Sequence, residues 1–316
     1  MPQLAALVLF GLSMGGCRPD VQPKDVQSHL IAGTETVQSD VISVSVDERW
    51  LVFSEENPET IGRGAYGARL SSIELGTVHK TAHRIDHLPD RALKSADEAT
   101  RWDRVSGYLS AGCWNDGRCY INTSGRLGYK DLVLIPGVPE LEIAPLPEEL
   151  NCSDCPPLRL AATTARERGV SNLSEYSIAF RNGQLANDMY YGETRDGAAS
   201  IWTVDESGQR EKVLEVRVRF KSATIEGVRV SPDERFLAYV VGSKLKAPVP
   251  TPDMIDEVFV RELDTGREVR IGKYRIVGNL LWSADSRRIY YPAFGQDPKD
   301  KGVYRADATE LLDHQE

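Results

Sequence analysis

The chain has 316 residues, of which 41% are hydrophobic and 27% are charged, as in an ordinary globular protein. Its formal net charge is −9, and no stretch rich in Lys or Arg occurs in it. Because nucleic-acid binding depends on clustered basic side chains, this composition argues against a nucleic-acid partner. Length alone would suggest about two domains, although all-β architectures also form single units of this size.

The first 16 residues are apolar and carry no charged side chain. The stretch is too short to span a bilayer and has the size of the apolar region of a signal peptide. We therefore predict a signal peptide at 1–16 and a polar linker with two Pro residues at 17–27. A single domain is expected at 28–316.

The residues before the linker indicate how the chain is anchored. Gly15-Gly16-Cys17 resembles the lipobox of bacterial lipoproteins, in which the Cys thiol carries the lipid. The resemblance implies a domain tethered by Cys17 to a membrane, on the periplasmic side of the cell envelope. Arg18 stands where Asp would retain such a protein at the inner membrane, so the outer membrane is implied. A plain secretory signal with an unrelated Cys, or a misassigned start, is the alternative.

Residues 38–86 are predicted to form four strands. The segment 44–53, Val-Ser-Val-Asp-Glu-Arg-Trp-Leu-Val-Phe, is typical of a strand, a tight turn and a second strand, and 78–85 is expected to be the outer strand. Three histidines, His79, His83 and His87, follow one another at intervals of four. On a helix neighbouring members could bind a metal together, but on a strand they lie about 13 Å apart. We expect exposed histidines and no cofactor; a metal site is the alternative.

The other four cysteines come in two close pairs, which favours an oxidising compartment. Cys113 and Cys119 flank an Asp116-Gly117 turn, so a hairpin would place them opposite each other and allow a disulfide. Cys152 and Cys155 form a CxxC in a polar loop followed by two Pro residues. A redox site or half of a zinc site are alternatives there. We expect a loop disulfide, because no helix N-terminus and no second ligand pair is near in the sequence.

The turn pattern of the first segment recurs along the chain. Ser-x-Asp-x-Arg appears again from Ser231 and from Ser283, and Asp116-Gly-Arg keeps its second half. Four short antiparallel strands cannot bury both faces alone and must stack on copies of themselves. We predict five four-stranded blades, with room for a sixth in 148–170 or around 88–105. Their ranges are 38–86, 99–147, 168–219, 222–272 and 274–306.

These repeats resemble the TolB-like, WD-type propeller repeat of bacterial periplasmic proteins, whose motif is close to Ser-Pro-Asp-Gly-x-x-Leu-Ala-Tyr. The resemblance extends over roughly residues 40–306 and is strongest in the last two blades. It implies an all-β fold, a β-propeller, and no particular chemistry. Propellers usually close through their two chain ends, and residues 29–37 would supply the fourth strand of the last blade.

No catalytic signature is present in the sequence. A Gly-x-Ser-x-Gly elbow, a phosphate loop and a Rossmann glycine pattern are all missing, so we do not expect an enzyme. The repeated Asp-x-Arg pairs could act as acids and bases. Their recurrence at the same turn of successive blades favours a turn-capping role instead.

The long connections all fall on one rim of the predicted propeller. Turns between first and second strands are minimal, whereas 54–67, 243–256, 87–102 and 147–169 join strands at the opposite rim. Binding residues concentrate in loops on rigid scaffolds, so we expect this rim to bind an envelope protein partner. The candidate contact residues are Arg63, Tyr66, Lys244, Lys246 and Pro248. The alternatives are an enzyme or oligosaccharide binder that uses the central channel, and a purely structural envelope protein.

Overall fold

A computed structural model of the chain describes the strands and most tight turns. The described residues are 24–25, 28–32, 34, 37–45, 47–56, 68–75, 83–84, 105–113, 119–125, 131–134, 141–143, 164, 167–170, 176–181, 184–195, 198–216, 223–243, 255–295 and 297–308. Among them, strands predominate, and the fold is all-β.

The described strands form five sheets, named here sheets one to five in chain order, and every pairing within them is antiparallel except that of β1 with β18. Sheet one contains β3 (Val37–Val44), β4 (Trp50–Glu56), β5 (Ala68–Glu74) and β6 (His83–Arg84). Sheet two contains β7 (Val105–Cys113), β8 (Cys119–Gly125), β9 (Asp131–Leu134) and β10 (Leu141–Ile143). Sheet three contains β11 (Tyr176–Arg181), β12 (Gln184–Arg195), β13 (Ala198–Val204) and β14 (Arg210–Val216).

Sheets four and five include short strands from the N-terminal part of the chain. Sheet four contains β15 (Ala223–Val230), β16 (Phe236–Ser243), β17 (Asp256–Glu262) and β18 (Glu268–Tyr274), with β1 (Lys24–Asp25) at its edge. Sheet five contains β19 (Ile276–Val277), β20 (Leu281–Trp282), β21 (Arg288–Phe294) and β22 (Lys301–Asp307), with β2 (His29–Leu30) at its edge. The 3₁₀ helix η4 (Pro298–Asp300) precedes β22. Sheets two and three lie within their predicted ranges. The main strands of sheets one, four and five pass the ends of theirs by one or two residues, at Val37, Tyr274 and Asp307.

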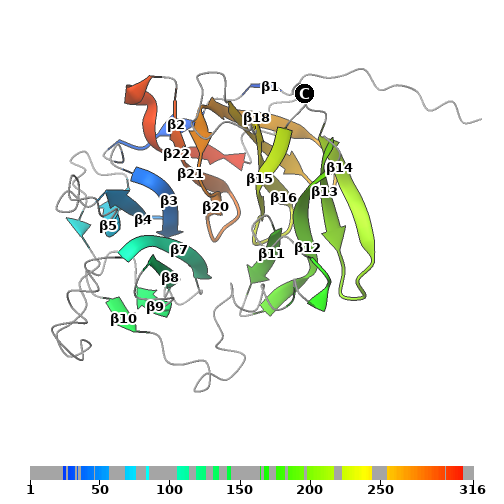
Figure 1. Ribbon diagram of the computed structural model, residues 1–316, viewed down its shortest axis with the longest axis horizontal. Helices are drawn as coiled ribbons and strands as arrows, with labels where there is room; N and C mark the ends of the chain where they lie inside the picture. The colour runs from blue at the N-terminus through cyan, green and yellow to red at the C-terminus, as the bar shows by residue number, and fades with distance from the viewer. Residues whose placement is uncertain are drawn as a thin grey trace, which may run out of the picture.

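The sheets lie side by side around a common centre (Figure 1). Contacts join β3 to β7, β11 and β12 to β15, β15 to β20, and β21 to β3. These contacts make sheet two a neighbour of sheet one, and sheet one a neighbour of sheet five. Sheet five in turn contacts sheet four, and sheet four contacts sheet three. The number of blades in the ring and its closure remain predictions.

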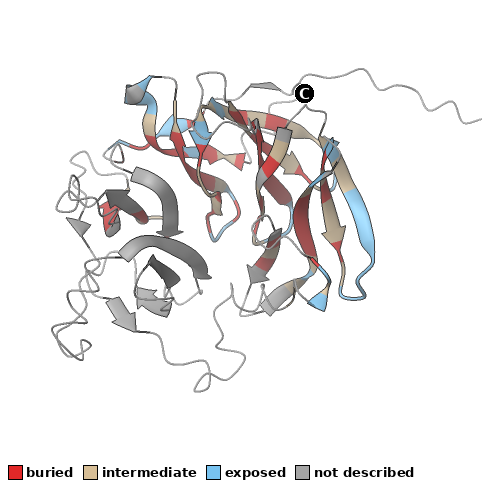
Figure 2. Ribbon diagram, viewed as in Figure 1, coloured by how far each residue is buried: buried red, intermediate tan, exposed pale blue. Residues whose placement is uncertain are grey.

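The central strand β16 shows why a single sheet is not stable alone. Its side chains are buried on both faces, and successive residues enter different cores. Phe236, Ala238 and Val240 pack in the cluster shared with sheet five, whereas Leu237, Tyr239 and Val241 pack in the cluster shared with sheet three. Because side chains alternate across a strand, both neighbouring sheets are needed to cover it. Figure 2 shows this burial along sheets three to five.

The N-terminal segment joins two sheets in succession. β1 pairs with β18 in parallel, with Lys24 opposite Val269, and β2 pairs with β22 antiparallel, with Leu30 opposite Tyr304. The Thr34 hydroxyl donates to the carbonyl of Ile31 and accepts from the amide of Val303, 2.8 Å away. The Thr34 hydroxyl thus accepts the hydrogen bond of the Val303 amide in place of a backbone carbonyl, and β2 ends at Leu30.

Two boundaries differ from the sequence predictions. The segment predicted to complete the last blade, 29–37, pairs with β22 only over its first residues, and Val37 belongs to β3 in sheet one. The predicted linker 17–27 contains β1, which is a strand of sheet four. The predicted pairing with the last sheet is thus confirmed for His29 and Leu30. A two-residue strand carries no alternating pattern, so the sequence contained no signal for the pairing of β1.

Candidate functional site

One turn is built three times from the same side chains: between β3 and β4 in sheet one, between β15 and β16 in sheet four, and between β20 and β21 in sheet five. In sheet four, the Ser231 hydroxyl donates to Asp233 Oδ1 at 2.6 Å and accepts from the amide of Phe236 at 2.9 Å. Asp233 Oδ1 also accepts from the amide of Arg235. Equivalent bonds start from Ser45 in sheet one and from Ser283 in sheet five. The predicted turn-capping role of these aspartates is confirmed in all three turns.

The residue after each Asp has left-handed backbone geometry. The φ angles are +53° at Glu48, +60° at Glu234 and +64° at Ser286. This region favours glycine, the residue that the propeller motif has at this position. The chain therefore accepts local strain three times. The substituted side chains of Glu48 and Ser286 each form a hydrogen bond with a neighbouring sheet.

Those two contacts join neighbouring sheets at this rim. Glu48, in the turn of sheet one, accepts from Arg288 at 2.6 Å and from the Tyr290 hydroxyl at 2.8 Å, both in sheet five. The Ser286 hydroxyl, in the turn of sheet five, accepts from the amide of Asp233 in sheet four. Burial, together with the hydrogen bond to Glu48, raises the pKa of Tyr290 above its ordinary value.

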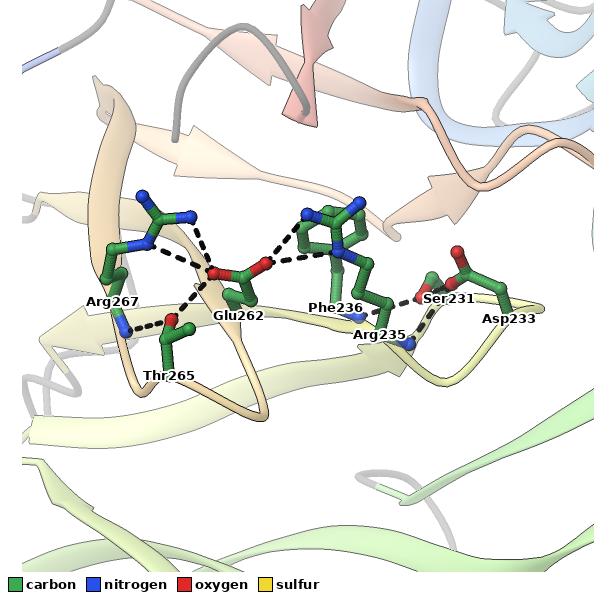
Figure 3. Close-up of polar contacts among 7 residues, drawn as sticks. All are labelled: Ser231, Asp233, Arg235, Phe236, Glu262, Thr265 and Arg267. Carbon is green, nitrogen blue, oxygen red and sulfur yellow. Dashed lines mark hydrogen bonds and ion pairs between the residues drawn. The ribbon is translucent and has the colours of Figure 1, made fainter. Parts of the chain in front are cut away.

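The Arg of the motif reaches the end of the third strand (Figure 3). Arg235 donates twice to Glu262 Oε1, at 3.0 and 2.8 Å, while Arg267 and Thr265 donate to Glu262 Oε2. In sheet one, Arg49 pairs with Glu74 at the equivalent place. These described side chains thus bind one another.

The electrostatics of Glu262 agree with a structural role. Burial alone would raise its pKa, but hydrogen bonds from Thr265, Arg267 and Arg235 together lower it to about 2. A carboxylate held ionised in this way is a poor acid or base at neutral pH, because catalysis favours a pKa near the working pH. The cluster holds the turns of sheet four together.

The opposite rim has a different polar group, made of hydroxyls. Tyr291 donates to Ser28 Oγ at 2.7 Å, Ser28 Oγ lies 2.7 Å from the Tyr274 hydroxyl, and the two tyrosine hydroxyls are 3.2 Å apart. The Tyr304 ring packs 4.6 Å from that of Tyr274. Burial raises the pKa of Tyr291 and of Tyr274, so both hydroxyls stay protonated at neutral pH. They lock the N-terminal segment to sheets four and five.

The strand ends define two unlike rims. We call the rim of the Ser-x-Asp-x-Arg turns the turn rim; its described connections are 45–49, 205–209, 231–235, 263–267 and 283–287. We call the other the loop rim; its longer connections are 57–67, 85–104, 144–175 and 244–255. Antiparallel pairing alone assigns each connection to its rim. The loop rim also has short connections, such as 196–197 and 295–300.

Most predicted site residues lie outside the described part of the chain. These are Cys17, Arg63, Tyr66, His79, His87, Cys152, Cys155, Lys244, Lys246 and Pro248. His83 lies in β6, which pairs with β5 as the outer strand of sheet one and agrees with the predicted strand. The roles predicted for the residues outside the described part of the chain therefore remain predictions.

The cysteines of sheet two lie where the hairpin prediction placed them. Cys113 and Cys119 are directly paired across β7 and β8. Residues facing each other across antiparallel strands are within the usual span of a disulfide. The register is confirmed, and the disulfide remains a prediction.

Two further searches concern the described residues alone. Within them, no group of three or more His, Cys, Asp or Glu side chains is arranged to hold a metal ion. Over the same part of the chain, no helix has the length and apolar character needed to cross a membrane.

The chain was compared with known proteins. No protein-family model and no curated protein matches it. Among solved structures, it is similar to TolB from Acinetobacter baumannii at 13% identity and a TM-score of 0.30, over 82% of this chain and 53% of TolB. The chain thus spans about half the length of TolB.

Two other similar structures are covered over most of their length. A putative glycosidase from Bacteroides thetaiotaomicron is 11% identical with a TM-score of 0.39, over 93% of this chain and 95% of that one. An oligogalacturonate lyase in complex with manganese is 12% identical with a TM-score of 0.39, over 90% and 82% of the two chains. At such identities, none of these proteins assigns an activity to this chain.

Proposed function

We propose that this protein is a lipid-anchored β-propeller of the cell envelope that binds a protein partner through its loop rim. In this proposal the five sheets are blades, β2 on β22 closes the ring, and Cys17 carries the lipid. A disulfide joins Cys113 to Cys119. The observation that carries the proposal is the contrast between the rims.

The turn rim is unsuited to a partner. Its side chains are engaged with one another: Asp233 with the turn of Ser231, and Arg235 and Arg267 with Glu262. A partner would have to replace these bonds, and leaving such groups unpaired costs about 1–3 kcal/mol each. Binding through this rim is therefore unfavourable.

The loop rim can change without disturbing the core. The connection 244–255 begins after Ser243 and ends before Asp256, and both flanking strands are hydrogen-bonded along their length. Its sequence, Lys-Leu-Lys-Ala-Pro-Val-Pro-Thr-Pro-Asp-Met-Ile, contains three Pro residues and two Lys residues on an acidic protein. Proline reduces the entropy that such a segment loses on binding, and the lysines favour an acidic partner surface.

The experiment is a pull-down of the full chain from a chemically cross-linked envelope, compared with a chain in which 244–255 is replaced by a short hairpin turn. We expect the full chain to recover a stoichiometric protein and the shortened chain to recover much less. The control is Asp233→Ala at the turn rim, which should recover as much as the full chain. Loss of the partner with Asp233→Ala but not with the shortened chain would contradict the proposal.

A further inference from the structure

The direction of β1 determines which rim faces the membrane. Lys24 lies opposite Val269 and Asp25 opposite Arg270, so the chain runs parallel to β18. β18 begins with Glu268 at the turn rim and ends with Tyr274 at the loop rim. Followed from Asp25 back to Lys24, β1 therefore points toward Glu268 and the turn rim. Ser28, which follows β1, is hydrogen-bonded to Tyr274 at the other end.

The length of the remaining tether limits where the anchor can lie. Six residues, 18–23, separate Cys17 from Lys24. Fully extended, the seven steps reach about 25 Å. A tether that doubled back along the strand would use about 17 Å only to come level with Tyr274.

We infer that the turn rim is the face that the protein presents to the membrane, and that the loop rim points away from it. This inference rests on the proposed lipid at Cys17. In this orientation the turn rim faces the lipid headgroups. The loop rim, with the longer connections, is free to bind a protein partner on the side away from the membrane. The turn rim carries both signs of charge, such as Asp285 and Arg287, so the tether and not charge orients the protein.

The test uses lysines that the chain already has on each side. Lys212 is exposed near the start of β14 at the turn rim, whereas Lys273 and Lys299 are exposed at the loop rim. The lipidated full-length protein is bound to vesicles that contain a lipid whose headgroup carries a succinimidyl ester on a short arm. Acylation of each lysine is measured by peptide mass spectrometry and divided by its acylation with a soluble ester.

We expect this ratio to be several-fold higher for Lys212 than for Lys273 or Lys299. A lysine introduced by Asp264→Lys, in the turn 263–267 beside β1, should give the highest ratio of all. Equal ratios at the two rims, or a higher ratio at the loop rim, would overturn the inferred orientation.

A matched variant tests whether the short tether is the cause. About 30 Gly and Ser residues inserted after Arg18 have a typical span of about 30 Å and should bring the ratios of the two rims together. A preference that survives the insertion would show that the tether does not set the orientation, and would overturn the inference. The mass of the N-terminal peptide tests the anchor separately: a chain without acyl groups contradicts the lipid proposal, and the orientation with it.

Discussion

The first hairpin of sheet two differs in sequence from those of sheets one, four and five, and we predict that a different chemistry stabilises it. In the latter, a Ser hydroxyl and an Asp carboxylate replace missing backbone partners. In sheet two, Trp114 stands two residues before Asp116, where the other turns have Ser, and Cys113 and Cys119 face each other across the strands. The Ser hydroxyl on which the other three networks are built is therefore missing there, and the predicted disulfide between Cys113 and Cys119 would join the two strands instead.

The largest loss of stability is expected from a substitution at Glu262, which extends the polar network of the turn in sheet four. Glu262→Gln removes the buried charge that accepts from Arg235, Arg267 and Thr265. We expect a loss of about 2–3 kcal/mol in the free energy of unfolding, measured by urea denaturation. The control is Glu74→Gln in sheet one, where a more exposed carboxylate pairs with Arg49; it should lose much less because exposed ion pairs contribute little.

The same residue predicts how stability depends on pH. Because the pKa of Glu262 is lowered to about 2 in the folded protein from an ordinary 4.5, its contribution is present above about pH 4.5. It is lost as the pH falls from 4.5 toward 2. The difference in stability between the wild type and Glu262→Gln should therefore shrink over this range. A constant difference from pH 5 to pH 2.5 would show that the charge is unimportant.

Sheet two should respond to reduction and the other hairpins should not. A cross-link between Cys113 and Cys119 closes a very short loop, and its removal should cost about 2 kcal/mol on the chain-entropy estimate. We expect Cys113→Ser to lower the melting temperature of the oxidised protein. A reducing agent should lower it in the wild type as well, and have no such effect on the Cys113→Ser, Cys119→Ser double variant. Two free thiols at these positions in the purified protein would refute the disulfide.

Removing a single cap should have a smaller effect. Asp233→Ala loses the bonds from the Ser231 hydroxyl and the Arg235 amide, and we expect a loss of about 1 kcal/mol. Asp116→Ala, in the hairpin of sheet two, should cost less in the oxidised protein if the cross-link has replaced the cap. Equal losses in both hairpins would argue that the Asp has the same role in each.

The smallest expected change is an increase in the free energy of unfolding. Glu234→Gly relieves a left-handed residue at φ +60° and restores the glycine of the propeller motif, for about 1 kcal/mol of added stability. Ser286→Gly relieves the same strain but removes the hydroxyl that accepts from the Asp233 amide. It should therefore give little net gain. A larger gain at Ser286 than at Glu234 would mean that the contact between sheets four and five contributes nothing.

Sequence patterns predicted most of the strands and turns, but they missed the contacts between parts of the chain that are far apart in sequence. Alternation in 236–241 and the Ser-x-Asp-x-Arg turns placed the strands, because these signals are local. The pairing of Lys24 with Val269 and the bond from Arg288 to Glu48 join residues more than 200 positions apart. Neither has a local pattern. The candidate contact residues Arg63, Tyr66, Lys244, Lys246 and Pro248 lie outside the described part of the chain, so the sequence remains the only argument for them.

The early position of β1 and β2 in the chain has a consequence for biogenesis. These strands are synthesised first, yet their partners, β18 and β22, are nearly the last strands to be made. Until those strands are made, β1 and β2 lack their partners. Ser28 likewise cannot form its hydrogen bond with Tyr291, which lies 263 positions later. Contacts of such long range form slowly because the loop between them must close first. A chain that stops before β22 would therefore leave its own N-terminal strands unpaired, so folding can be completed only after nearly the whole protein has been made.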